Sequence, residues 1–326
     1  MKTIQLLVFV ILLVLNTGIF PVFAKAPKTA KIVFTSTRDG NKEIYTMSLD
    51  GSQQVRLTHN PADDLYPAWS PTGEQILFVS NRHGIPDLYL MEADGKSERR
   101  VFSKSARRED PTWSADGKQI AYERWERDGL AIYIATMDTK TEVRVAGGID
   151  PAWAPRRNEL AFIGTGDNRI AILTPQAPPP RKPIQGDRMF MKHPDWSPSG
   201  KMLVFSGREW DIDFGEFKTA VLYIVNRDGT DVRQIVKRTK LEFLGPVWSP
   251  QGDALLYEQR VGAKVIGKQV EGGRFQLFTT ALHGGKPKQL TQHGHNIQAD
   301  WFDPEALPVQ PNMTMLTMLW GELKKK

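Results

Sequence analysis

Short apolar runs alternate with polar turns along most of the chain, and no stretch keeps the period of a long amphipathic helix. Lys31–Ser36 and Gln75–Ser80 are typical runs, rich in the β-branched and aromatic residues that favour strands. Turn signals such as Asp94-Gly95 and Asp116-Gly117 bound these runs, because glycine adopts the positive φ of a tight hairpin. The pattern predicts an all-β protein built of antiparallel strands.

A phrase of the form Pro-x-Trp-Ser-Pro-x-Gly recurs along the chain and sets a longer period. Three apolar runs follow most copies, and four strands per repeat of about 40–50 residues is the pattern of a propeller blade. A tryptophan at a fixed place in every blade is expected to fill the core between neighbouring blades. The repeated tryptophans are Trp69, Trp113, Trp153, Trp196, Trp248 and Trp301, spaced 44, 40, 43, 52 and 53 residues apart.

The two ends of the repeat array complement each other. Three expected strands precede the first tryptophan and only one follows the last, so together they supply the strands of one more blade. We therefore expect a six-bladed β-propeller of four-stranded antiparallel blades, closed by strands from both termini. The expected boundaries are a signal peptide at residues 1–24, the propeller at 25–304 and a C-terminal tail at 305–326.

The N-terminus has the pattern of an export signal. Lys2 precedes an apolar run over residues 4–15, and Val22-Phe23-Ala24 resembles a cleavage site after Ala24. An uncleaved membrane anchor is the alternative, because residues 4–24 are about long enough to span a bilayer. Once the signal is removed we expect no transmembrane segment. The protein is therefore expected to be exported, to the periplasm in preference to the extracellular space.

Composition and charge exclude several classes of function. The chain has no cysteine, which excludes disulfides, zinc–thiolate sites and a cysteine nucleophile. Its net charge of +6 comes from dispersed basic residues rather than one patch, so nucleic acid is not an expected partner. The sequence also lacks the G-x-S-x-G, G-x-x-x-x-G-K-[ST] and H-E-x-x-H motifs of common enzymes.

The phrase Pro-x-Trp-Ser-Pro-x-Gly, followed by an [Asp/Glu]-[Ile/Leu]-Tyr strand and an Asp-Gly turn, resembles the TolB-like class of WD-repeat-like β-propellers. The resemblance covers nearly all of residues 31–304. It implies a rigid protein-binding ring and, for the best-known members, a role in the Tol–Pal envelope system. Those members carry an α/β domain before the propeller. Only six residues separate the expected signal from the first strand here, so that domain is not expected.

The residue three places before each tryptophan is expected at the mouth of the central channel. Loops entering the innermost strands converge there, which makes the mouth a natural concave site. The structural alternative is that these residues only cap strand entries. Asp110, Asp150 and His193 could also hold a divalent cation, although we expect no cofactor and no metal. The candidate mouth residues are Tyr66, Asp110, Asp150, His193 and Gln298, with Arg108 beside them.

Aromatic residues gather in hairpins expected on the same face as the mouth. Trp125 lies in one hairpin, and Trp210, Phe214 and Phe217 lie in a lengthened one. Exposed aromatic side chains next to charges are typical anchors of protein interfaces. We therefore expect these four residues to form a partner-binding rim.

Together these features favour an exported, non-enzymatic binding scaffold that recognises a protein or peptide partner of the cell envelope, as a monomer. The alternative is a propeller lyase or hydrolase acting on an exported carbohydrate or peptide. In that case Asp110, Asp150 and His193 would serve as acid, base or metal ligands.

Overall fold

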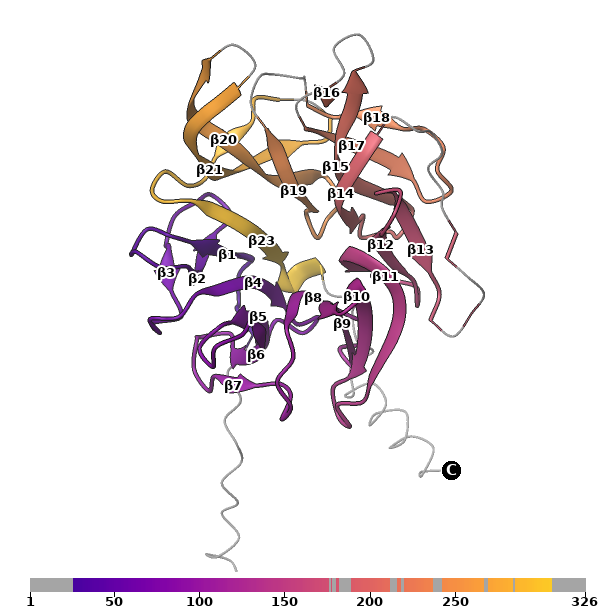
Figure 1. The fold of residues 1–326 in the computed structure, drawn as a ribbon. Coiled ribbons are helices and arrows are strands. Elements are labelled where there is room, and N and C mark those ends of the chain that lie inside the picture. The colour runs from indigo at the N-terminus through magenta and orange to yellow at the C-terminus, as the bar shows by residue number, and fades with distance from the viewer. Residues whose placement is uncertain are drawn as a thin grey trace, which may run out of the picture.

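The computed structural model describes residues 26–175, 177, 180–181, 189–211, 216–217, 220–236, 242–266, 269–283 and 285–306. The expected signal peptide lies outside these residues, as do Phe214 and positions 307–326 of the expected tail. Antiparallel sheets arranged around a centre form a β-propeller (Figure 1). Within the described residues, no helix has the length and apolar character needed to cross a membrane.

Five sheets make up the propeller. The first has the order β23-β1-β2-β3, with β23 Asn296–Phe302, β1 Lys31–Ser36, β2 Glu43–Ser48 and β3 Val55–Arg56. The second has the order β4-β5-β6-β7, with β4 Asp64–Trp69, β5 Gln75–Ser80, β6 Asp87–Glu92 and β7 Arg99–Arg100. The third holds six strands in sequence order, β8 Arg108–Trp113, β9 Gln119–Glu126, β10 Gly129–Thr136, β11 Glu142–Trp153, β12 Leu160–Gly164 and β13 Ile170–Leu173.

Two further sheets complete the architecture. The fourth has the order β14-β15-β17-β18, with β14 Met189–Trp196, β15 Met202–Asp211, β17 Val221–Asn226 and β18 Arg233–Gln234. The short strand β16 Glu216–Phe217 pairs with β15 beside this path. The fifth has the order β19-β20-β21-β22, with β19 Phe243–Trp248, β20 Ala254–Ile266, β21 Gln269–Ala281 and β22 Lys288–Gln289. A 3-10 turn, η1 Pro304–Ala306, follows β23.

The expectation of six four-stranded blades is wrong, because the described strands form five blades. The difference lies in β11, which is one continuous strand of 12 residues. Its first half pairs with β10 as far as Gly147, and its second half pairs with β12 from Gly148 onward. No polar loop separates the halves, so the repeats of Trp113 and Trp153 share one sheet. These two tryptophans are 40 residues apart, the shortest spacing in the array, as expected where the loop between two repeats is missing.

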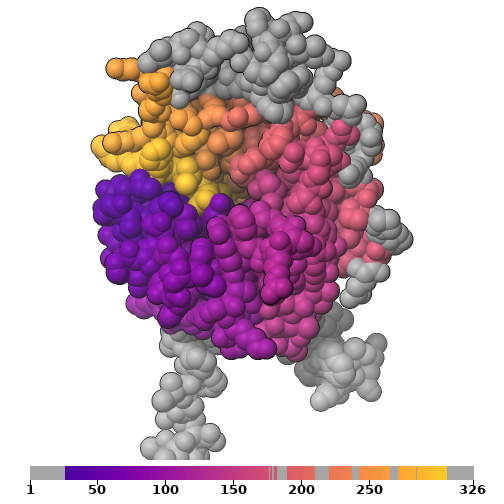
Figure 2. Space-filling model, in the orientation of Figure 1, coloured from indigo at the N-terminus to yellow at the C-terminus, as the bar shows by residue number. Residues whose placement is uncertain are grey.

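The innermost strands are those that carry the repeated tryptophans. They are β4, β8, the second half of β11, β14, β19 and β23, and each contacts the next around the centre. β23 contacts β4 and also pairs with β1 along the edge of the first sheet. Strands from both ends of the described chain therefore lie side by side, as the indigo and yellow surfaces in Figure 2 show. This pairing closes the ring between the first and last of the described strands.

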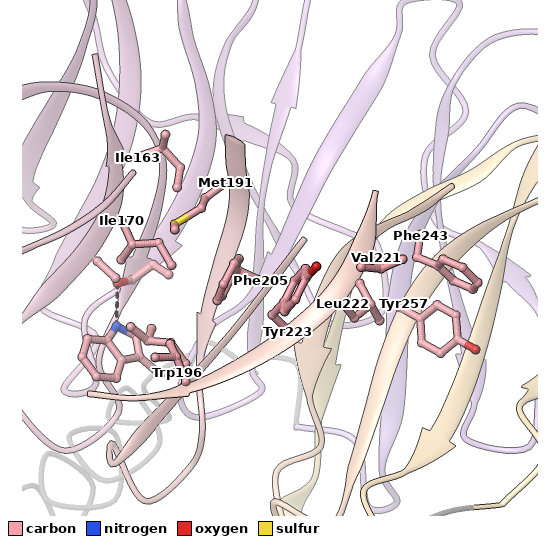
Figure 3. Close-up of a cluster of buried hydrophobic side chains, with 14 of the residues drawn as sticks. Ile163, Ile170, Met191, Trp196, Phe205, Val221, Leu222, Tyr223, Phe243 and Tyr257 are labelled. Carbon is pink, nitrogen blue, oxygen red and sulfur yellow. Dashed lines mark hydrogen bonds between the residues drawn. The ribbon is translucent and has the colours of Figure 1, made fainter. Parts of the chain in front are cut away.

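The core lies between neighbouring sheets, where the tryptophans are packed. Trp196 is 3% exposed and lies in a cluster with Met191, Phe205 and Tyr223 (Figure 3). Its Nε1 donates a hydrogen bond of 3.1 Å to the carbonyl oxygen of Ala152 on the preceding inner strand. Trp69, Trp113, Trp153 and Trp248 are likewise buried, and Trp301 is half-buried. The tryptophans thus fill the space between blades, and Trp113 and Trp196 also donate hydrogen bonds to the preceding inner strand.

Candidate functional site

Every innermost strand is interrupted three residues before its tryptophan by a residue in the left-handed conformation. The φ angles of these residues lie between 48° and 54°. The pairing register shifts next to this position in the inner strands, which marks a β-bulge. The six positions are Tyr66, Asp110, Asp150, His193, Gly245 and Gln298. Only one is glycine, so the other five hold backbone conformations that cost about 1–3 kcal/mol each.

These bulges bring the expected mouth residues together. The six bulge residues line one central pocket with a volume of about 520 Å³, which we call the channel mouth. Its walls also contain the prolines that follow the bulge residues, such as Pro111 and Pro151. Residues far apart in the sequence therefore converge on one concave site because each strand bends at the same place.

Hydrogen bonds connect the bulge residues around the channel mouth. The Tyr66 N–H donates to Gln298 Oε1 at 3.2 Å, and the Gln298 N–H donates to Glu258 Oε1 at 2.7 Å. On the other side, the Asp150 N–H donates to Glu123 Oε1 at 2.7 Å. The His193 N–H in turn donates to Asp150 Oδ2 at 2.9 Å. Side chains from one strand thus stabilise the strained backbone of the next.

Three carboxylates meet on one side of the channel mouth. Each of Asp110, Glu123 and Asp150 has an oxygen within 4.8 Å of the others, and we call them the acidic trio. Burial raises the pKa of Glu123 to about 8, and the charge of Asp150 adds to this effect. Burial also raises the pKa of Asp110 well above its usual value, with Glu123 and Asp150 contributing. The trio can therefore retain a proton near neutral pH, attract a cationic group or ligate a divalent cation.

Glu123 was not among the expected site residues, although the repeat contains a signal for it. Aligned on the tryptophans, Glu123 and Glu258 stand where other repeats have Val79, Ile163 and Ser206. Both glutamates accept a hydrogen bond from the bulge residue of a neighbouring inner strand. A glutamate at this position of the repeat therefore marks a side chain that reaches the bulge of a neighbouring inner strand.

Two more carboxylates lie among the pocket residues one position before a tryptophan. Asp195 accepts the Trp248 N–H at 2.8 Å, and Asp300 accepts the Trp69 N–H at 2.6 Å. Burial raises the pKa of Asp195 to about 7 and the pKa of Asp300 to about 6. The lining of the channel is therefore more acidic than the sequence analysis expected.

Arg108 does not line the channel mouth. Its side chain is 1% exposed and ion-paired with Asp87 at 2.8 Å and with Glu142 at 2.8 Å. Its guanidinium also lies 4.1 Å from the ring of Phe102. The Arg108 side chain is thus a buried cation between the second and third sheets, and it does not reach the expected position at the channel mouth.

The structure describes only part of the expected partner-binding rim. Trp125 is 47% exposed at the β9–β10 hairpin, and the Arg107 guanidinium lies 4.1 Å from its ring. The backbone of Trp210 pairs with that of Phe217, while the side chains of both lie outside what the structure describes. Trp125 is therefore the described aromatic residue that is available as an anchor on this rim.

Replacing Glu123 by glutamine is expected to stabilise the protein more at alkaline than at acid pH. The folded-state pKa of about 8 lies above the ordinary value of 4.5, so folding favours the neutral acid. That contribution is complete below about pH 4.5 and is lost as the pH rises through about 8. Glutamine stays neutral and can still accept the Asp150 N–H. We expect a gain of about 1–3 kcal/mol at pH 9 and under about 0.5 kcal/mol at pH 4.

Urea unfolding at the two pH values measures this difference. The exposed Glu74, replaced by glutamine, is the matched control and should show no pH-dependent gain. An equal effect of the Glu123 substitution at both pH values would contradict the expectation.

The arrangement of five sheets around the channel mouth defines the class of the protein as a β-propeller. Residues 16–149 match the family model described as the TolB beta propeller domain. The expected resemblance to TolB-like β-propellers is therefore confirmed.

Known proteins similar to this chain include Tol-Pal system proteins and a peptidase. The Tol-Pal system protein TolB of Geobacter sulfurreducens is 51% identical over 49 residues, which are 15% of this chain and 11% of that protein. The crystal structure of TolB from Acinetobacter baumannii is similar with a TM-score of 0.70 and 19% identity, covering 83% of this chain and 66% of that one. A puromycin-hydrolyzing peptidase of Mycobacterium tuberculosis is similar with a TM-score of 0.56 and 12% identity, covering 82% of this chain and 46% of that one. At these identities the structural likeness shows the fold alone.

Proposed function

We propose that this protein is a periplasmic binding scaffold that recognises a protein or peptide partner of the cell envelope across the channel mouth. One observation carries the proposal. Six bulged strands build a pocket of about 520 Å³, and the exposed Trp125 lies on a hairpin at the same end of the blades. The similarity to Tol-Pal system proteins supports a partner in the envelope.

The rigidity of the ring supports binding through preformed loops. Hydrogen bonds between the strands of neighbouring repeats fix the mouth residues before any partner arrives. A preorganised site avoids much of the entropic cost of ordering loops during association. The acidic trio favours a cationic group in the part of the partner that enters the mouth. Binding by these groups requires no metal or other cofactor.

An enzyme is the second candidate, because Glu123 can carry a proton near neutral pH beside Asp150. Paired carboxyl groups with separated pKa values are the arrangement used for acid–base catalysis. The similar propeller-containing peptidase shows that this fold occurs in a hydrolase. In this case Asp150→Asn would abolish turnover of a carbohydrate or peptide while substrate binding persists.

The scaffold proposal is tested by site-specific photo-crosslinking of the full chain in living cells. A crosslinker in place of Trp125 should capture one defined envelope protein. A crosslinker in place of Val232 is the matched control, because Val232 is similarly exposed in the β17–β18 turn at the other end of its blade. Trp125→Ala should then weaken binding of the purified partner by about 10- to 100-fold, in EDTA as well as without it. Equal capture from both positions, or binding abolished by EDTA, would contradict the proposal.

A further inference from the structure

A second pocket opens beside the channel mouth, between β14, β15 and β19. Its volume is about 310 Å³, and we call it the lateral pocket. It shares His193 and Leu244 with the channel mouth, so the two hollows adjoin at these residues. The side chains that matter for its chemistry belong to Phe190, Lys192, His193, Ser206, Arg208 and Leu244.

The lateral pocket is cationic, whereas the adjoining side of the channel mouth is acidic. Lys192 and Arg208 line it, and no carboxylate does so among the described residues. Within that described part, Lys192 has no ion-pair partner. Its ammonium nitrogen lies 6.0 Å from the ring of Phe190. One cation of the pocket is thus available to an incoming anion.

Arg208 keeps a positive charge in the pocket even though it has an internal partner. Its guanidinium donates to Glu242, and Arg260 also donates to Glu242 at 2.8 Å. One carboxylate is therefore shared between two guanidinium groups, so the net charge of Arg208, Arg260 and Glu242 together is positive. The Arg208 side chain is 41% exposed, which leaves donors accessible from the pocket.

The two charge zones meet at Lys192. This lysine is close enough to lower the pKa of Glu123, against the larger effects of burial and Asp150. The neighbouring His193 lines both hollows. A peptide lying across this boundary would meet carboxylates on one side and cations on the other.

We propose that the lateral pocket binds a carboxylate of the partner peptide, namely an aspartate or glutamate side chain next to the residue that enters the channel mouth. Lys192 and Arg208 provide the charge-assisted hydrogen bonds, and Phe190 and Leu244 provide an apolar wall for the methylene groups. This inference rests on the proposed function, because it specifies the sequence that the same face recognises: a cationic residue followed or preceded closely by an acidic one.

Two matched peptide arrays test the proposal with the full chain. Each array holds acetylated and amidated peptides of random sequence with one fixed lysine and, two residues away on either side, glutamate in one array and glutamine in the other. We expect the protein to bind the glutamate array about 10-fold more tightly. Lys192→Met and Arg208→Gln should each reduce this preference to under about 3-fold.

Exposed cations outside the pocket provide the controls. Lys201→Met and Arg233→Gln should leave the preference for glutamate unchanged. Lys192→Glu should go further and reverse the preference toward glutamine, a gain that a misfolded variant could not produce. Equal binding of both arrays by the wild-type protein would overturn the lateral pocket and leave the scaffold standing. Binding of neither array would overturn both proposals.

Discussion

Replacing Trp196 by alanine is expected to lower the free energy of unfolding by about 3–5 kcal/mol. The side chain is 3% exposed and packs in the cluster that spans the third, fourth and fifth sheets. Removing it deletes that apolar contact and leaves a cavity that rigid flanking strands cannot fill. It also leaves the Ala152 carbonyl without the 3.1 Å hydrogen bond from the indole.

Chemical denaturation of the purified variant measures this loss. Trp125→Ala is the matched control, since this tryptophan is 47% exposed and should contribute under about 1 kcal/mol to stability. The two substitutions should therefore have opposite effects on stability and on partner affinity. Trp196→Ala should lower stability while the folded protein keeps its partner affinity, and Trp125→Ala should do the reverse. A Trp196 variant as stable as the wild type would contradict the inter-sheet packing.

The repeat phrase contains enough information to predict the strands and the mouth. The tryptophan marks the innermost strand, and a fixed offset of three residues leads to the bulge in every repeat. Because the same short phrase imposes the same bend, Asp110, Asp150 and His193 could be placed at one site without knowing any distance. The strand bounds Lys31–Ser36 and Gln75–Ser80 follow from the apolar runs in the same way.

The rest depends on pairings that a single repeat does not encode. Glu123 reaches the site from the second strand of its blade, so the register between β8 and β9 is needed to place it beside Asp110 and Asp150. Two repeats are fused through β11 because its pairing partner changes from β10 at Gly147 to β12 at Gly148. The side on which Arg108 lies depends on the bulge at Asp110, which breaks the alternation of faces along β8. Proximity in sequence alone therefore does not tell that the Arg108 side chain lies away from the channel mouth that Asp110 lines.

Replacing Arg108 by methionine is expected to lower the free energy of unfolding by about 3–5 kcal/mol at pH 7. The substitution keeps the apolar length of the side chain. It removes one hydrogen bond of 2.8 Å to Asp87 and two hydrogen bonds of 2.8 Å to Glu142. Asp87 is buried, and among the described residues its charge would keep Arg100 as its remaining ion-pair partner. The loss therefore reflects carboxylates left with fewer cationic partners rather than lost packing.

The pH dependence of this loss follows from Glu142. Burial alone would raise the pKa of Glu142, but hydrogen bonds from Arg108 and Tyr122 outweigh it and lower the pKa below 4.5. A lowered folded-state pKa adds stability above the unfolded-state value, and this stability is lost as the pH falls through the folded-state value. The difference between the wild type and Arg108→Met should consequently shrink below about pH 4.

Urea unfolding at pH 7 and pH 3.5 distinguishes this structural role from a role in ligand binding. Arg144→Met is the matched control, because Arg144 is 47% exposed and its ion pairs with Glu126 and Asp128 lie on the surface. It should cost under about 1 kcal/mol at either pH. If Arg108 is structural, the folded fraction of Arg108→Met should bind the partner with unchanged affinity. Weaker binding at unchanged stability would instead return Arg108 to the binding face that its position in the sequence first indicated.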